Sequence, residues 1–358
     1  MAQLKDTMGM LDLMIRPGFC VKDNVIVKVN PAAQCIPIQV GTRVSKLLAT
    51  GKKEYKEFGG GCLYLTLDLY GKYCGATVTR MEDFDVFLLE QSGDQAELQA
   101  LALAARELRD PLTSIMTTTD CLFPTDAAQS DPVIREQLSR LNRGLYQMLR
   151  LIGNMSDAER YASGTSVRME TVDITALMRE IFSKATALVE HTGITLEFTN
   201  LKQPLPCLAD RDMLERAVLN LLSNSLKFTP RGGTVSASLA KRAGLLILTI
   251  QDNGEGIADS LKGSFYNRYL RQSTIEDSRQ GIGLGMVLVR NAAALHGGTV
   301  LLDQPEGTGT RITMTMAIRQ STDSAVHSPR LRIDYAGERD HSLIELSEIL
   351  PAQFYETK

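Results

Sequence analysis

The sequence predicts a multidomain α+β protein, and three observations support this fold class. The chain has 358 residues, which is enough for two or three domains. Apolar residues recur every three or four positions across residues 92–162, as in paired helices. Residues 165–319 alternate helix and strand patterns, whereas residues 1–90 show mainly strand patterns. A polar linker and one short helical pattern occupy residues 320–358.

The composition is that of an ordinary globular protein and argues against several classes. The chain is 44% hydrophobic with a net charge of −3, so we expect no nucleic-acid partner. No apolar run approaches the roughly 20 residues that span a bilayer, and the N-terminus lacks a signal-peptide pattern. The six cysteines form no CxxC pair and the four histidines are dispersed, which predicts reduced thiols and no metal cluster. We therefore expect a cytoplasmic protein without a membrane span.

Residues 1–90 are predicted to form a small α/β module. Two apolar segments flank a turn within Val21–Val29, and alternating leucines at 63, 65, 67 and 69 predict a strand. Ala76–Val78 extends the antiparallel pattern. Together with the step Asn30-Pro31-Ala32-Ala33, these segments resemble a PAS sensor domain, which often precedes a helical hairpin in signalling proteins. A small α+β module of another type is the alternative.

Residues 92–162 predict an antiparallel helical hairpin. Asp94 and Glu97 have the spacing of a capping box, and Asp131 followed by Pro132 can begin the second helix. The apolar seam of the first helix runs through Leu98, Leu101, Ala105, Leu108, Leu112 and Ile115, and that of the second through Ile134, Leu138, Leu141, Leu145, Met148, Ile152 and Met155. Such regular seams demand a partner, so we expect two hairpins to form a four-helix bundle in a homodimer. Packing within one chain is the alternative.

Residues 165–319 predict an α/β sandwich with a mixed sheet and helices on one side. Asp173 and Asp210 are placed to cap two helices. Further elements are expected as a helix to about Val189, an extended Ile194–Phe198, a hairpin of Val235–Leu239 with Leu245–Ile250, a helix from about Gly285 to Leu295, and strands near 299–302 and 311–317. In the tail, Asp340 and Pro351 bound one short amphipathic helix. We expect that helix to dock on its own chain, and a partner-binding peptide is the alternative.

The run Ala104–Ile115 resembles the H-box of sensor histidine kinases, the receptors of two-component signal transduction. In that family, the position of Arg106 holds the histidine that accepts phosphate from ATP. Arg106 cannot replace it, because a guanidinium stays protonated and has no lone pair for attack. Glu107, the acidic neighbour of the family's histidine, is retained. Arg106 follows the seam residue Ala105, so we expect its side chain to point away from the bundle.

Three motifs downstream resemble the ATPase fold that histidine kinases share with gyrase, Hsp90 and MutL, known as the GHKL, Bergerat or HATPase_c fold. Asn220–Phe228 is similar to its N-box, with Asn220, Asn224 and Lys227 on one helix face. The resemblance implies that Asn224, helped by Asn220, holds Mg²⁺ and that Lys227 contacts phosphate. The alternative is a polar helix face without a ligand.

The remaining motifs complete the resemblance to an ATP site. Asp252–Ile257 matches the G1 box, in which Asp252 would accept a hydrogen bond from adenine while Gly254 and Gly256 let the backbone approach the base. If Asp252–Ile257 is considered alone, the alternative is a turn that binds no ligand. Gly281–Met286 matches the G2 box, which opens a helix whose amide groups can bind phosphates. The implied binding residues here and in the lid and final glycine box are Gly281, Gly283, Leu284, Gly285, Tyr266, Arg271 and Thr310.

The reactive groups of the related enzymes are changed in this sequence. Hydrolytic relatives place a glutamate base where this chain has Asn220, and phosphatase-active histidine kinases place Thr or Asn where it has Asp110. The sequence therefore predicts a degenerate histidine kinase, or pseudokinase, that binds ATP and Mg²⁺. It would signal by conformation or by pairing with a response regulator or another histidine kinase. The alternative is an active kinase that phosphorylates another chain or a non-histidine acceptor such as Thr113.

Overall fold

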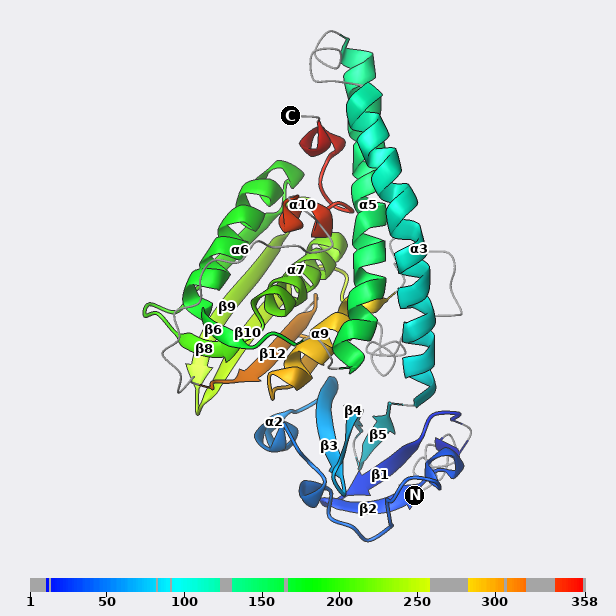
Figure 1. Ribbon diagram of the computed structural model, residues 1–358. Helices are drawn as coiled ribbons and strands as arrows, with labels where there is room; N and C mark the ends of the chain where they lie inside the picture. Colours follow the sequence, from blue (N-terminus) through cyan, green and yellow to red (C-terminus); the bar gives the residue numbers. More distant parts are fainter. Residues whose placement is uncertain are drawn as a thin grey trace.

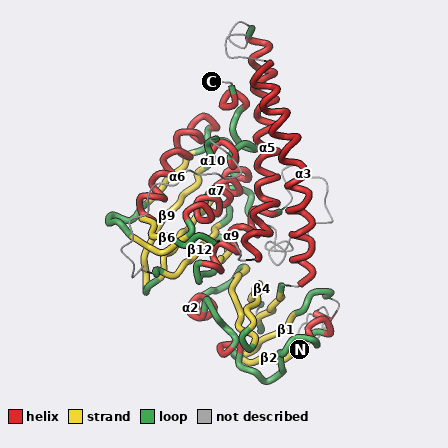
Figure 2. The backbone as a smooth tube through the Cα atoms, in the orientation of Figure 1, coloured by secondary structure: helices red, strands yellow, loops and turns green. Residues whose placement is uncertain are grey.

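The computed structural model describes residues 11–12, 14–81, 83–90, 92–122, 131–163, 167–257, 283–305, 308–319 and 339–356. A small N-terminal β-rich module, a long helical hairpin and a larger α/β domain are visible in these residues (Figure 1). The C-terminal residues lie beside the hairpin rather than beside the N-terminal module (Figures 1 and 2).

The N-terminal module is a five-stranded antiparallel sheet in the order β2-β1-β5-β4-β3. Its elements are β1 (Gly18–Lys22), β2 (Val25–Val29), η1 (Pro31–Ala33), η2 (Val44–Lys46), α2 (Lys52–Glu57), β3 (Cys62–Leu69), β4 (Lys72–Arg80) and β5 (Asp85–Leu89). The predicted turn between the first strands is present, and both Asp23 and Asn24 have positive φ. Stacked rings of Phe19 and Phe87, 4.7 Å apart, lie in its core. The PAS-like character of the module stays a prediction.

The hairpin consists of α3 (Ser92–Leu122) and α5 (Pro132–Ser163). As predicted, α5 begins after Asp131, whose Oδ1 accepts a hydrogen bond from the Val133 amide at 2.8 Å. The prediction that Asp94 caps α3 was wrong. Because β5 ends at Leu89 and the chain is already helical from Ser92, Asp94 lies inside the helix.

Only alternate residues of the predicted seams are buried in the chain. Ala105 and Leu112 of α3 are buried against residues such as Leu145 and Ile152 of α5, and Leu98 is buried in the larger core cluster. Other seam residues are exposed, with exposed fractions of 46% for Leu108, 47% for Ile115, 44% for Leu141 and 45% for Met148. Leu101 and Met155, also in the seam, are half-buried against the core. Part of the seam therefore joins the two helices, and part is left uncovered by the described residues.

The α/β domain contains the predicted mixed sheet, and its strand order is β11-β12-β10-β9-β7. Its strands are β7 (Thr195–Thr199), β9 (Thr234–Arg242), β10 (Leu245–Asp252), β11 (Val300–Asp303) and β12 (Arg311–Ala317), with β7 parallel to β9. Helices α6 (Ile174–Val189), α7 (Arg211–Phe228) and α9 (Leu284–Leu295) lie together over the sheet (Figure 1). Asp173 and Asp210 cap α6 and α7 through backbone amides, as expected from the sequence. A turn η3 (Glu190–Thr192) follows α6, and a second sheet pairs β6 (Glu170–Asp173) with β8 (Pro206–Ala209).

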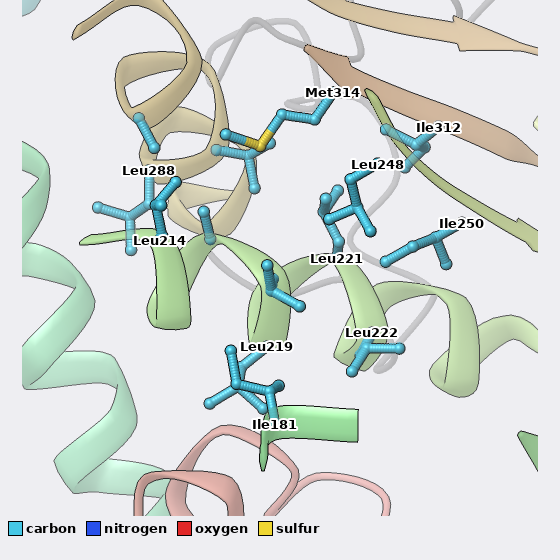
Figure 3. Packing of buried hydrophobic residues seen from close by; sticks show 14 of the residues in the cluster. Ile181, Leu214, Leu219, Leu221, Leu222, Leu248, Ile250, Leu288, Ile312 and Met314 are labelled. Atoms are coloured by element: carbon cyan, nitrogen blue, oxygen red, sulfur yellow. The ribbon is translucent and has the colours of Figure 1, made fainter. Parts of the chain in front are cut away.

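Helix α7 is attached to the sheet by its leucines. Leu214 and Leu221 face apolar side chains of the strands and of α9, among them Leu248, Met314 and Leu288 (Figure 3). These side chains are less than 6% exposed. Burying each one stabilises the fold by about 1.5–3 kcal/mol. The apolar face fixes the rotation of α7, so its polar face is turned away from the sheet.

The N-terminal sheet and the α/β sheet are continuous. Strand β3 pairs antiparallel with β11, with Tyr64 opposite Val300 and Cys62 opposite Leu302, which produces one ten-stranded sheet. Next to this junction, Arg290 of α9 pairs with Glu90 at 2.9 Å and lies 5.6 Å from the ring of Tyr64. The two domains are therefore connected by backbone hydrogen bonds and a charged contact as well as through the hairpin.

The C-terminal residues form α10 (His341–Glu345) and η5 (Ala352–Tyr355) and dock on their own chain, as predicted. The Ser342 amide donates to Asp340 Oδ1 at 2.8 Å, which confirms the predicted cap. The helix is shorter than expected and ends at Glu345 rather than near Pro351. One reason is that side chains of α5 take the carbonyls of Ser347 and Glu348, which a longer helix would use internally.

Candidate functional site

Asp252 lies where four segments meet. It ends β10 and is 4% exposed, and its Oδ1 accepts hydrogen bonds from the amides of Gly254 at 3.1 Å and Thr310 at 3.0 Å. Burial raises the pKa of this carboxyl group, while the two amides and the Ser225 hydroxyl act to lower it. The carboxylate is thus held rigidly in a partly desolvated position, where it can orient a hydrogen-bonding ligand.

The glycines around Asp252 allow the backbone segments to approach closely. A Cβ atom on Gly254 would lie 2.3 Å from the carbonyl oxygen of Phe228, the last residue of α7. Gly309 has a φ of 108°, and a Cβ there would lie 2.0 Å from the carbonyl oxygen of Asp252. Gly256 also has positive φ. The G1-like turn, the end of α7 and the loop before β12 are consequently in direct contact.

Asn220 presents an amide oxygen toward the start of α9. The side chain is 1% exposed, and its Nδ2 donates to the Arg216 carbonyl at 2.9 Å. Its Oδ1 has no hydrogen-bond partner among the described residues and lies 2.6 Å from where a Cβ on Gly285 would be. A buried acceptor of this kind fits a hard cation or its bound water, because Mg²⁺ prefers oxygen ligands. Asn224, one turn further along α7, is half-buried.

The start of α9 has the geometry predicted for a phosphate-binding turn. Gly283 is its N-cap with a φ of 78°, and Leu284 is its buried first residue. The first amides of a helix lack intrahelical acceptors and carry partial positive charge, so they can bind an anion. The structure thus brings Asn220 together with Gly285, and Asp252 together with Gly254 and Thr310, at two places along α7.

Three predicted site residues, Tyr266, Arg271 and Gly281, lie outside the described residues. Lys227 is described, but its Nζ is 2.5 Å from Glu348 Oε2 of the C-terminal region. Arg106 and Glu107 are exposed on α3, as the seam predicted. Within the described ranges, no hydrogen bond or ion pair links either of them to the residues around Asp252.

A buried charged network, which the sequence reasoning missed, attaches the hairpin to α7. Arg216 is 2% exposed, and it pairs with Asp157 of α5 at 2.6 Å and with Glu345 of α10 at 3.3 Å. Arg150 of α5 donates to the Ser223 hydroxyl at 3.0 Å. The sequence held one signal for this network. Arg216 lies four residues before Asn220, and therefore on the same face of the helix.

Two family models match the chain. Residues 209–320 match the family described as histidine kinase-, DNA gyrase B- and HSP90-like ATPase, HATPase_c. Residues 96–164 match the His Kinase A (phospho-acceptor) domain, HisKA. The first match covers the residues around Asp252, and the second covers the hairpin that carries Arg106.

Known proteins with similar sequences are sensor kinases. An uncharacterized sensor-like histidine kinase of Rhizobium meliloti (strain 1021) is 29% identical over 73% of this chain and 52% of its own length. The signal transduction histidine-protein kinase/phosphatase MprB of Mycolicibacterium vanbaalenii is 30% identical over 68% of this chain and 51% of its own length. Among solved structures, full-length ShkA in complex with AMPPNP matches with a TM-score of 0.49 and 22% identity, covering 62% of this chain and 46% of that one.

These matches support the sensor histidine kinase family for this chain, with a HisKA and a HATPase_c domain. The chain spans about half the length of these two relatives. Of the helices that the structure describes, none is both long enough and apolar enough to cross a membrane. The described part of the chain also contains no cluster of three or more side chains suited to a metal site of His, Cys, Asp or Glu.

The contact between Gly285 and Asn220 can be tested by substitution. We expect Gly285→Ala to lower the free energy of unfolding by about 1–3 kcal/mol, because the new Cβ must displace the buried Asn220 amide. Gly59→Ala is the matched control, since it is exposed with nothing within 4 Å, and it should change stability by at most about 1 kcal/mol. Urea denaturation measures both. Equal stabilities for the two variants would contradict the packing.

Proposed function

We propose that this chain binds ATP and Mg²⁺ in its HATPase_c domain and acts in two-component signalling as a degenerate sensor histidine kinase. The proposal is supported by the contacts of Asn220 with Gly285 and of Asp252 with the turn amides, in a chain that matches HATPase_c and has Arg106 at the position that resembles the H-box histidine. Such a protein would signal by conformation or by pairing with a response regulator or another histidine kinase.

Each proposed site residue would make a different contact with ATP or Mg²⁺. Asp252 would accept a hydrogen bond from the adenine amino group, and Gly254 and Gly256 would admit the base. The first amides of α9 would bind phosphate oxygens. Asn220 and Asn224 would hold Mg²⁺, which offsets phosphate charge when bound. The remaining proposed contacts are Lys227, Tyr266, Arg271, Gly281, Gly283, Leu284, Gly285 and Thr310.

No described histidine offers a replacement acceptor at this site. His341 is buried, with its Nδ1 3.5 Å from Glu215 Oε1. His296 is buried, its Nε2 accepts from the Asp210 amide at 3.0 Å, and its Nδ1 lies 2.7 Å from the Ala292 carbonyl. Burial also lowers its pKa, so this ring is a neutral structural group. The ring of His191 packs edge-on against Phe354 at 5.1 Å. These positions support the view that the imidazole chemistry of the family is missing here.

The exposed half of the hairpin seam supports a homodimer. Leu108 and Ile115 on α3 and Leu141 and Met148 on α5 continue the apolar repeat but are not covered by any of the residues that the structure describes. Two copies that pair these residues would complete a four-helix bundle. The N-terminal module would then be a PAS-like sensor placed directly before α3.

Nucleotide binding is the first test of the proposal. We expect calorimetry to detect ATP-Mg binding to the unmodified protein, and we expect Asn224→Ala to lower the affinity at least about tenfold. Asn224 is a better position for this substitution than Asp252. Removing the Asp252 carboxylate would leave the amides of Gly254 and Thr310 without their acceptor and destabilise the domain. Lys241→Ala, exposed at the far end of β9, is the control. No measurable affinity in the unmodified protein would sink the proposal.

Dimerisation is the second test. Leu108→Glu combined with Leu141→Glu should convert the dimer to monomer, because burying unpaired carboxylates between hairpins costs several kcal/mol. Leu103→Glu is the matched control, since Leu103 is 65% exposed and lies outside the seam. Light scattering after gel filtration at micromolar concentration gives the mass. A monomeric unmodified protein would refute the bundle.

The missing histidine is the third test. We expect Arg106→His to gain acid-labile phosphate from γ-labelled ATP, while the unmodified protein gains none. The reason is that position 106 faces outward on α3 and Glu107 remains beside it. Arg140→His, exposed on α5, serves as a control for labelling of any surface histidine. If the unmodified protein itself acquires phosphate, an active kinase with a different acceptor replaces the degenerate one.

A further inference from the structure

Residues 340–355, here called the C-terminal segment, are packed like core residues against α5 and α7. Ile344, Leu346 and Leu350 are fully buried. The ring of Tyr355 contacts that of Tyr146 of α5 at 5.0 Å, and its hydroxyl donates to the Leu343 carbonyl. In Figure 1 the segment, drawn in red, lies between α5 and the helices α6 and α7. The segment thus occupies a defined surface of the protein.

Helix α5 provides a row of donors for the backbone of this segment. Asn142 donates to the Tyr355 carbonyl at 3.0 Å. Arg143 donates to the carbonyls of Ser347 at 3.0 Å and Glu348 at 2.9 Å, and Gln147 donates to Ser347 at 3.1 Å. These side chains lie on one face of α5. The hydrogen bonds to the carbonyls of Ser347, Glu348 and Tyr355 fix the register in which the segment docks.

Two carboxylates of the segment meet three cations of α5 and α7. Glu345, which is fully buried, lies 3.1 Å from Arg150 and 3.3 Å from Arg216. Glu348 lies 3.0 Å from Arg150 through Oε1 and 2.5 Å from Lys227 through Oε2. Burial alone would raise the pKa of Glu348, but Arg150 and Lys227 lower it, so the group is ionised at neutral pH. The segment therefore presents a fixed anion to Lys227.

We infer that the C-terminal segment is an autoinhibitory ligand of the α/β domain. Glu348 forms an ion pair with Lys227, the residue that would otherwise contact phosphate. This inference rests on the proposed function, in which Lys227 serves ATP. A carboxylate and a phosphate oxygen are both anionic acceptors, so they compete for the same ammonium group and repel each other when close. Binding of ATP-Mg and docking of the segment therefore oppose each other.

Release of the segment has a second effect, on the hairpin. Arg150 belongs to α5 and Arg216 to α7, and Glu345 bridges them. When Glu345 leaves, the α5–α7 interface loses a carboxylate between two arginines, while Arg216 keeps its contacts with Asp157 and Asn154 of α5. Nucleotide occupancy is thereby coupled to how tightly the hairpin is held on the nucleotide domain.

Calorimetric titration of the full chain with ATP-Mg tests the competition. Glu348→Gln keeps the size of the side chain but removes its charge, and it should tighten ATP-Mg binding by about 3–10-fold. Glu356→Gln, an exposed acid just beyond the segment, is the control and should bind like the unmodified protein. Equal affinity of Glu348→Gln and the unmodified protein overturns the inference.

A second variant separates docking from a local charge effect. Arg143→Gln weakens the hold of α5 on the segment and is not among the proposed nucleotide contacts, yet it should also tighten ATP-Mg binding. If only Glu348→Gln has an effect, Glu348 acts as an isolated charge and the inhibitory segment is refuted. Amide hydrogen exchange provides an independent readout, since residues 340–355 should exchange faster in saturating ATP-Mg. Unchanged exchange on saturation overturns the inference.

The two proposals fail in different ways. Absence of ATP-Mg binding in every protein, Glu348→Gln included, refutes the nucleotide function and the competition together. Binding that is present but equal in all variants refutes only the inhibitory segment. Binding that is detectable in the unmodified protein and tighter in Glu348→Gln supports both.

Discussion

The docking of the hairpin and of the C-terminal segment on α7 depends on the buried guanidinium of Arg216. It pairs with Asp157 and Glu345, which lie far from it in sequence on either side, and donates to Asn154 of α5 at 2.5 Å. A charge removed from water is tolerable only when its partners are in place, and loss of one partner costs about 3–5 kcal/mol. The network therefore selects one relative arrangement of the three elements, although apolar burial supplies most of the stability.

One face of α7 combines two tasks. Arg216 and Ser223 contact α5, while Asn220 and Lys227, on neighbouring turns of the same face, belong to the proposed ATP site. The opposite face is fixed in the sheet by leucines, so α7 cannot rotate to serve one task without the other. Through this shared face, a ligand at the proposed ATP site would also affect the contact between α7 and α5.

Local signals in the sequence predicted most of the elements, because their causes are local. Asp173 and Asp210 cap their helices, and Ala243-Gly244 forms the turn between β9 and β10 with positive φ at both residues. The sequence also identified the glycines that pack around Asp252. It could not reveal the pairing of β3 with β11 or the ion pair of Lys227 with Glu348, which join residues far apart in the chain. The failed cap at Asp94 shows that a neighbouring strand can set where a helix begins.

The pairing of β3 with β11 also determines how the chain can be divided. An isolated α/β domain would present the backbone amides and carbonyls of β11 to solvent, together with Leu301, which packs against the core of the N-terminal module in the intact protein. An uncovered, apolar strand edge is a template for self-association. The N-terminal module thus covers the β11 edge of the α/β domain. Its sequence is therefore constrained by the need to keep that edge paired.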